Sequence, residues 1–249
     1  MILAAHEMGA GPVVVLLHGL FGSARNLGAV QRALSARFRV IALDLRNHGD
    51  SPHDPVMDYD TMAADVLETL AAKDCLPAAF VGHSMGGKVA MRLALTAPQQ
   101  VRRLVVADIA PVPYPPHFDT FAEAMLAIPP QLSRTEADAA LAAAIPDQPV
   151  RSFLLHNFRS GSGWRIGLAE IAAALPTIAQ WAESGVSYPG PTLFVTGARS
   201  NYVQPQDRPL ITELFPAVRF VAIKDAGHWL HSEQPVAFNA TLEAFLAPL

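Results

Sequence analysis

The chain has 249 residues, of which 51% are hydrophobic and 16% are charged. This balance excludes an intrinsically disordered chain, and the length is sufficient for one large domain with a sizeable buried core. The formal net charge is −4 at pH 7, and no run of Lys or Arg is present. Nucleic acid and anionic membrane surfaces are therefore not expected as partners.

Cys75 is the only cysteine, so no disulfide can form within the chain, which suits a reducing compartment. Residues 1–12 lack the charged region and the long apolar region of a secretory signal. No apolar run approaches the roughly 18 residues that a membrane span needs. We therefore expect a soluble cytoplasmic protein without a membrane span, whose oligomeric state the sequence leaves open.

Short apolar runs alternate with longer amphipathic segments through the first half of the chain. The former predict buried strands and the latter predict helices. In chain order we expect a strand at 13–17, a helix at 26–38, a strand at 38–43, a helix at 60–73 with Asp58 or Asp60 as its N-cap, a strand at 78–81, a helix at 85–96 and a strand at 104–107. This alternation predicts a mostly parallel, doubly wound α/β sheet with helices on both faces.

The composition changes after Asp108. A proline-rich stretch at 110–116 is incompatible with a helix or a central strand. From 117 to 185 the pattern predicts only short helices, without strands, broken at Pro129, Pro130, Pro146, Pro149 and Pro176. The alternation returns with strands at 192–196 and 219–223 and a helix at 235–245. We therefore predict a core formed by residues 1–110 and 186–249, with a helical cap at 111–185 inserted after the strand that ends at Asp108.

Ser84 lies in a Gly-x-Ser-x-Gly pattern between the predicted strand at 78–81 and the predicted helix at 85–96. The pattern alone is weak evidence, because glycine is a common residue. A nucleophilic serine at a sharp strand-to-helix turn needs small neighbours, and the start of the helix points free N–H groups at the reacting centre. Ser84 is therefore the candidate nucleophile, and the alternative is a plain glycine turn with an exposed serine.

A serine nucleophile also needs an oxyanion hole and a base. The N–H of Met85 is one expected oxyanion donor, and the glycine-rich loop after the strand at 13–17 offers Leu20, with Phe21 as the alternative. His228 follows the last predicted strand and therefore lies at the same edge of the sheet as Ser84, which makes it the candidate base. Of the other histidines, we expect His83 to point elsewhere, His231 to lie at a helix entry, and His18 and His48 to shape loops.

The loop with His18 and Gly19, the Gly-His-Ser-Met-Gly-Gly run at 82–87 and the late Gly-His at 227–228 together resemble the α/β-hydrolase superfamily. In many members the acid of the triad follows the penultimate strand, where this chain has Ser200. The next carboxylate, Asp207, lies further along and is expected in a helix.

Asp108 ends the strand that follows the helix after Ser84, at a position that parts of the superfamily use for the acid. A carboxylate there would orient the imidazole of His228. The alternative is that Asp108 caps the insertion. Asp44 is expected to have a structural role, and Asp225 lies too close to His228 in the chain to orient it.

Longer motifs at 18–23, 44–52, 82–88, 108–112 and 226–229 are similar to those of the YbfF-type bacterial esterases, which have a related mitochondrial branch. The similarity extends from about residue 13 to the C-terminus, with a shortened N-terminal strand, and in the insertion it is limited to Gly163, Trp164 and Arg165. It implies the α/β-hydrolase fold, an acid at Asp108 and a supporting serine at Ser200. It says less about the substrate than about catalysis.

We hypothesise a serine hydrolase that cleaves carboxylic esters of short to medium acyl chains through an acyl-enzyme. Ser84, His228 and Asp108 form the triad, Ser200 supports it, and Leu20 and Met85 bind the oxyanion. No cofactor or metal is expected, since no His/Cys cluster has ligand spacing and no glycine-rich phosphate loop is present. The alternatives are an acyl-CoA thioesterase, with Arg159 and Arg165 near the phosphates, other chemistry on the same fold, or a non-catalytic ligand-binding protein.

Overall fold

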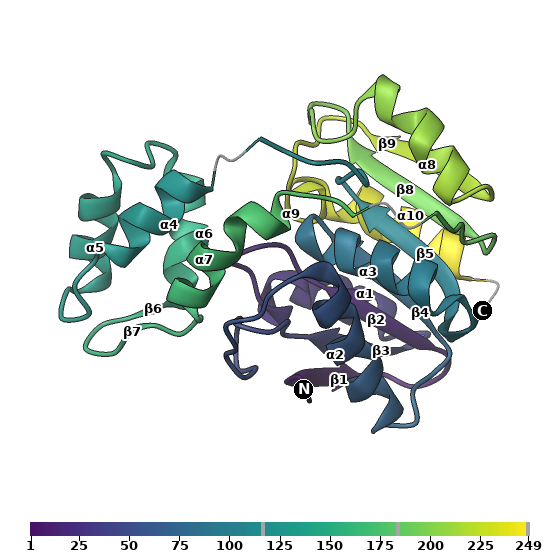
Figure 1. Cartoon of the computed structure of the whole chain (residues 1–249), viewed down its shortest axis with the longest axis horizontal. Helices are drawn as coiled ribbons and strands as arrows, with labels where there is room; N and C mark the ends of the chain where they lie inside the picture. The colour runs from purple at the N-terminus through teal and green to yellow at the C-terminus, as the bar shows by residue number, and fades with distance from the viewer. Residues whose placement is uncertain (116–117, 183–184, 248–249) are drawn as a thin grey trace.

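The computed structural model describes residues 1–115, 118–182 and 185–247. Pro116, the last residue of the predicted proline-rich linker, lies outside these ranges. Seven strands form one sheet in the order β1-β3-β2-β4-β5-β8-β9 (Figure 1). Their bounds are β1 Ala5–Met8, β2 Val13–Leu17, β3 Arg39–Leu43, β4 Ala78–His83, β5 Val101–Ala107, β8 Thr192–Gly197 and β9 Val218–Ile223.

Only the short strand β1 runs antiparallel to its neighbour, and every other pairing in this sheet is parallel. The central strands β2, β3 and β4 are almost wholly buried, which explains why their sequences read as continuous apolar runs. The expected α/β-hydrolase architecture is confirmed. Because the strands are parallel, the loops that follow β2, β4, β5, β8 and β9 meet at one edge of the sheet.

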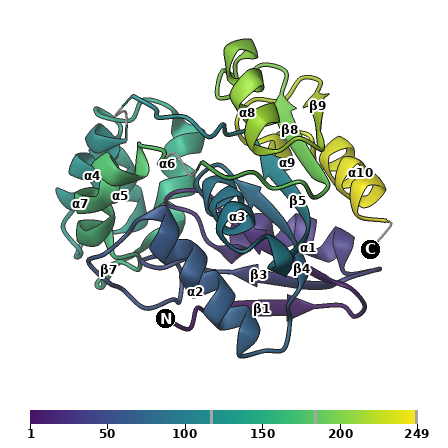
Figure 2. The ribbon, with the colours of Figure 1, turned by 45° about the vertical axis from the view of Figure 1, so that its right-hand side comes forward.

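Two helical layers cover the sheet (Figure 2). On one face lie α2 Tyr59–Ala71, α3 Met85–Thr96 and α8 Arg208–Leu214, and on the other lie α1 Gly28–Leu34 and α10 Pro235–Leu246. The predicted helix at 26–38 is shorter than expected, because η1 Ala24–Leu27 precedes it and Ser35 ends it. Asp58 is the N-cap of α2, since its carboxylate accepts the Thr61 N–H at 2.7 Å.

The segment between β5 and β8 carries the helices α4 Asp119–Leu126, α5 Arg134–Leu141, α6 Gln148–Leu154 and α7 Leu168–Ile178. They gather to one side of the sheet in Figure 1, and we call this segment the cap. The domain boundaries at 110/111 and 185/186 stay predictions.

Two expectations about the cap were wrong. A short hairpin interrupts its helices, formed by the two-residue strands β6 Phe158–Arg159 and β7 Gly163–Trp164. It is too short to give a period-two pattern, and it turns at Gly161 and Gly163, whose φ angles are +85° and +78°. Pro176 does not break a helix but lies inside the last turn of α7. Within residues 1–115, 118–182 and 185–247, no helix has both the length and the apolar character needed to cross a membrane.

Candidate active site

Ser84 lies at the sharp turn between β4 and α3, with φ 52° and ψ −121°. This left-handed backbone is unfavourable for a non-glycine residue and is stabilised only by its surroundings. A Cβ on Gly82 would lie 2.2 Å from the Gly86 carbonyl oxygen, and a Cβ on Gly86 would lie 2.4 Å from the carbonyl oxygen of Leu17. The two glycines therefore allow strand and helix to approach closely enough to present the Ser84 hydroxyl.

Three side chains from three strand ends form a continuous hydrogen-bonded chain. Ser84 Oγ lies 3.1 Å from His228 Nε2, and His228 Nδ1 lies 2.8 Å from Asp108 Oδ2. His228 is on the loop between β9 and α9 Leu230–Glu233, and Asp108 directly follows β5. This is the arrangement in which a carboxylate fixes the tautomer of an imidazole, and the imidazole can then accept the serine proton.

The Asp108 carboxylate is buried and accepts hydrogen bonds from two further donors. The Gly197 N–H donates to Oδ1 at 3.0 Å, and the Ser200 hydroxyl donates to Oδ2. Ser200 thus lies beside the acid rather than in its place. Asp207, the first carboxylate after β8 in the chain, instead accepts the Gln204 N–H at 2.7 Å.

The imidazole of His228 is packed between two rings that the sequence did not indicate as site residues. The Tyr202 ring stacks on it at 3.9 Å between centroids, with 19° between planes. On another side, His83 Nε2–H donates to the His228 carbonyl oxygen at 2.8 Å, and the two rings lie 4.8 Å apart. Burial lowers the pKa of His83 well below its usual value, so its ring is neutral near pH 7. The expectation that His83 points elsewhere was wrong, because its ring supports the backbone of His228.

The loop at residues 19–22 lies between β2 and η1 and carries Leu20, the expected oxyanion donor, and for that expectation we call it the oxyanion loop. Its turn is closed by the Gly22 N–H, which donates to the Gly19 carbonyl oxygen at 3.0 Å. The Phe21 N–H donates to His48 Nε2 at 3.1 Å and is therefore not available to an oxyanion. Within the described residues, the Leu20 N–H has no acceptor, and the Met85 N–H lies at the first position of α3, where no intrahelical acceptor exists.

Three further histidines near the site, His18, His48 and His231, are buried. His18 Nε2 accepts the Leu45 N–H at 3.0 Å, and burial lowers the pKa of His18. Burial also lowers the pKa of His48 to about 3 and that of His231 to about 4. His231 lies in α9 with its ring 4.6 Å from that of His83. As expected, His18 and His48 hold loops.

Two pockets meet at Ser84 and Leu20. The first encloses about 520 Å³, including space open to solvent, and is lined by Tyr59, Lys88, Ile109, Tyr114 and Leu175 among others. The second encloses about 560 Å³ on the same measure, and its lining includes Phe121, Phe153, His228, Trp229 and His231. Both are mostly apolar, and cap residues contribute to each of them.

Lys88 is buried and is one of the residues that line the first pocket. Its ammonium donates to the carbonyl oxygens of Val112 and Gln180, at 2.8 and 3.0 Å, and lies 4.9 Å from the centre of the Tyr114 ring. Burial lowers the pKa of Lys88 to about 7. Because Val112 and Gln180 lie on the two segments that connect the cap to the core, this one side chain contacts both connections.

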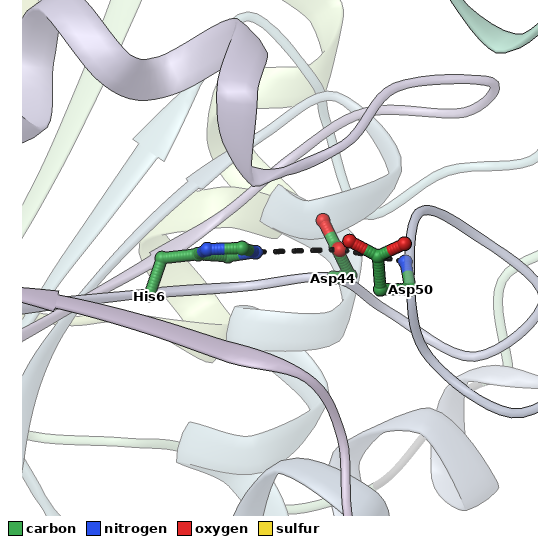
Figure 3. A group of neighbouring side chains, drawn as sticks. All are labelled: His6, Asp44 and Asp50. Atoms are coloured by element: carbon green, nitrogen blue, oxygen red, sulfur yellow. Dashed lines mark hydrogen bonds and ion pairs between the residues drawn. The ribbon is translucent and has the colours of Figure 1, made fainter.

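One group of possible metal ligands lies apart from this site. His6, Asp44 and Asp50 present ligand atoms within 4.8 Å of one another (Figure 3). Asp44, however, accepts the N–H groups of Ala24 and Asp50, and Asp50 forms an ion pair with Arg165. These bonds give Asp44 the structural role expected for it.

Comparison with known proteins identifies the family of the chain. A family model described as the α/β-hydrolase fold matches residues 12–235. The chain belongs to the α/β-hydrolase family. It is 41% identical to the sn-1-specific diacylglycerol lipase ABHD11 of Mus musculus, over 95% of this chain and 81% of that protein.

The resemblance to YbfF-type esterases is also confirmed. The chain is 40% identical to esterase YbfF of Escherichia coli strain K12, over 94% of this chain and 92% of that protein. The solved structure of a marine microorganism esterase superposes with a TM-score of 0.94 at 35% identity, covering 98% of this chain and 99% of that one. These similarities make the chain an enzyme of the carboxylesterase type.

Proposed function

We propose that this α/β hydrolase is a serine esterase with Ser84 as nucleophile, His228 as base and Asp108 as the acid that orients His228. The observation that carries the proposal is the chain of hydrogen bonds from Ser84 through His228 to Asp108, at 3.1 and 2.8 Å. His228 takes the proton of Ser84 as the hydroxyl attacks the ester carbonyl, and the N–H groups of Leu20 and Met85 stabilise the oxyanion. Water activated by His228 then releases the acyl group.

From the position of His228 we infer which part of the ester each pocket holds. The imidazole must protonate the departing alcohol, so the alcohol part occupies the second pocket, which His228 and Trp229 line. The acyl chain then occupies the first pocket. Lys88 follows Ser84 by four positions on α3, which corresponds to about 6 Å of helical rise. Because Lys88 lines that pocket about one helical turn from Ser84, together with Tyr59 and Tyr114, we propose that it takes short to medium acyl chains.

The test combines covalent labelling with a substrate series. A fluorophosphonate should label Ser84, and Ser84→Ala should abolish both labelling and turnover. Among p-nitrophenyl esters from acetate to laurate, kcat/KM should be highest between butyrate and octanoate. If the wild type shows neither labelling nor turnover, the esterase proposal is wrong and a non-catalytic ligand-binding protein is favoured instead.

The thioesterase alternative is tested with the same acyl groups carried as CoA thioesters. Arg165, one of the two arginines considered for the CoA phosphates, is already paired with Asp50. We therefore expect the esters to be the better substrates. Cytoplasmic location is part of the proposal and agrees with the single, buried Cys75.

A further inference from the structure

Asn157 belongs to the cap, yet its side chain bonds the backbone of the oxyanion loop. It ends the short helix η3 Leu155–Asn157, and its Nδ2 donates to the Phe21 carbonyl oxygen at 2.6 Å. Asn157 is only 5% exposed, so this bond is shielded from water. No motif in the sequence marked Asn157, because its partner lies 136 positions away in the chain.

Phe21 needs such support, because its backbone has φ 58°. An L-residue with a large side chain adopts this left-handed conformation only when its contacts impose it. One contact comes from the core, where His48 Nε2 accepts the Phe21 N–H, and the other comes from Asn157. The Phe21 ring also packs edge-on against that of Phe118 in the cap. Phe21 directly follows Leu20, so its backbone orientation determines where the Leu20 N–H points.

The hydrogen bond from the Phe21 N–H to His48 does not depend on pH near neutrality. His48 Nδ1–H donates to the Arg46 carbonyl oxygen at 2.8 Å, which leaves Nε2 as the acceptor for Phe21. The ring stays neutral because burial, with His18 nearby, keeps its pKa far below 7. The variable contact is therefore the one made by the cap.

The cap segment that carries Asn157 is docked on the loop that carries His48. The Arg165 N–H donates to the Asn157 carbonyl oxygen, and the Arg165 guanidinium pairs with Asp50. The Gly167 N–H donates to the Asn47 carbonyl oxygen at 2.8 Å. The cap segment and the core loop that hold the Phe21 backbone, through Asn157 and His48, are thus bonded to each other.

We propose that Asn157 is a positioning residue that couples docking of the cap to the shape of the oxyanion hole. The inference rests on the proposed function, because it concerns the Leu20 N–H as an oxyanion donor. When Asn157 donates to Phe21, the loop keeps its left-handed turn and the Leu20 N–H faces the reacting carbonyl. Without that bond the loop relaxes, and stabilisation of the transition state falls while the apolar pockets remain.

The test replaces the amide donor with side chains that cannot make this bond. Asn157→Asp keeps the shape and presents only acceptors at neutral pH, and Asn157→Ser is uncharged but too short to reach Phe21. We expect kcat to fall by about 10- to 100-fold, since one complete oxyanion donor is worth about 10²–10³ in rate. KM should change by less than threefold. Affinity for a trifluoromethyl ketone, whose hemiketal oxyanion occupies the hole, should fall in parallel with kcat.

Gln148→Glu is the matched control, because it makes the same amide-to-acid change on an exposed side chain of the cap. It should keep the kcat and the inhibitor affinity of the wild type. If both Asn157 variants keep wild-type kcat, or raise KM with kcat unchanged, Asn157 does not position the oxyanion hole. If the wild type itself neither turns over esters nor reacts with fluorophosphonate, the proposed function fails instead.

Discussion

At the scale of single residues, the hydrogen bonds around Asp108 support its proposed role as the acid of the triad. Asp108 has one oxygen bonded by the Gly197 N–H and the other by Ser200 and His228. Asp108→Asn keeps the shape but places an amide against His228, which disfavours the tautomer that accepts the serine proton. We expect kcat to fall by about 10²–10⁴, as when a buried acid of this kind is converted to its amide. Steady-state kinetics with a p-nitrophenyl ester measure the change, and circular dichroism checks the fold.

Ser200 and Asp207 provide the comparison for that variant. Ser200 is one of three donors to Asp108, so Ser200→Ala should cost no more than about tenfold in kcat, the value of a single supporting hydrogen bond. Among the described residues, the Asp207 carboxylate accepts a hydrogen bond only from the Gln204 N–H of its own turn, so Asp207→Asn should leave kcat unchanged. A large loss in Asp207→Asn with little loss in Asp108→Asn would show that the acid is misassigned.

The sequence predicts some of these residues well and others not at all, for a physical reason. Ser84, Asp108 and His228 each follow a strand of a parallel sheet, so the topology alone brings them to one edge. The roles of Tyr202 and Asn157 depend on contacts between segments about 26 and 136 positions apart, which no local pattern encodes. Lys88 did leave a signal, as a charged residue among small and apolar residues directly after Ser84.

At the scale of elements, the fit between β4 and α3 depends on the absence of a side chain at Gly86. A Cβ there would lie 2.4 Å from the Leu17 carbonyl oxygen and 2.5 Å from that of His18, and neither backbone atom can move freely. Gly86→Ala should therefore lower the free energy of unfolding by about 1–3 kcal/mol or more, despite the better helix propensity of alanine. Urea denaturation followed by circular dichroism gives the value.

Gly28 in α1 provides the opposite case. Its φ is −61°, and a Cβ would meet only the flexible end of Arg32, at 3.5 Å. Gly28→Ala should raise the free energy of unfolding by about 0.4–1 kcal/mol, because alanine restricts the unfolded chain. Equal effects of the two substitutions would contradict the argument that β4 and α3 pack closely at Gly86.

Element prediction succeeded where periodicity was long and failed where it was short. The helix expected at 85–96 has the bounds Met85–Thr96, and the six predicted strands are within a few residues of expectation. The pattern did not place β1 Ala5–Met8. The hairpin of β6 and β7 was missed because two residues cannot show a period. Pro176 was misread as a break, although a proline near the end of a helix removes only one hydrogen bond.

At the scale of the whole molecule, buried neutral histidines make the free energy of unfolding depend on pH. Burial is the main cause that lowers the pKa of His18, His48, His83 and His231, and the values for His48 and His231 are about 3 and 4. An unfolded histidine has a pKa near 6.5, so below that pH the unfolded chain binds protons that the folded chain does not. The free energy of unfolding should therefore fall as the pH is lowered from 6.5 toward 4.

His231 isolates this effect, because its Nδ1 is buried without a hydrogen-bond partner among the described residues. Replacing it by leucine therefore breaks no hydrogen bond at that atom. With a pKa of about 4 when folded, its share of the stability lost between pH 7 and pH 5 is about 2 kcal/mol. In His231→Leu the difference in unfolding free energy between the two pH values should shrink by that amount, measured by urea denaturation at each pH. Burial is the cause, so the same change at the exposed His156 should leave the difference as in the wild type, and an equal reduction in both variants would contradict the argument.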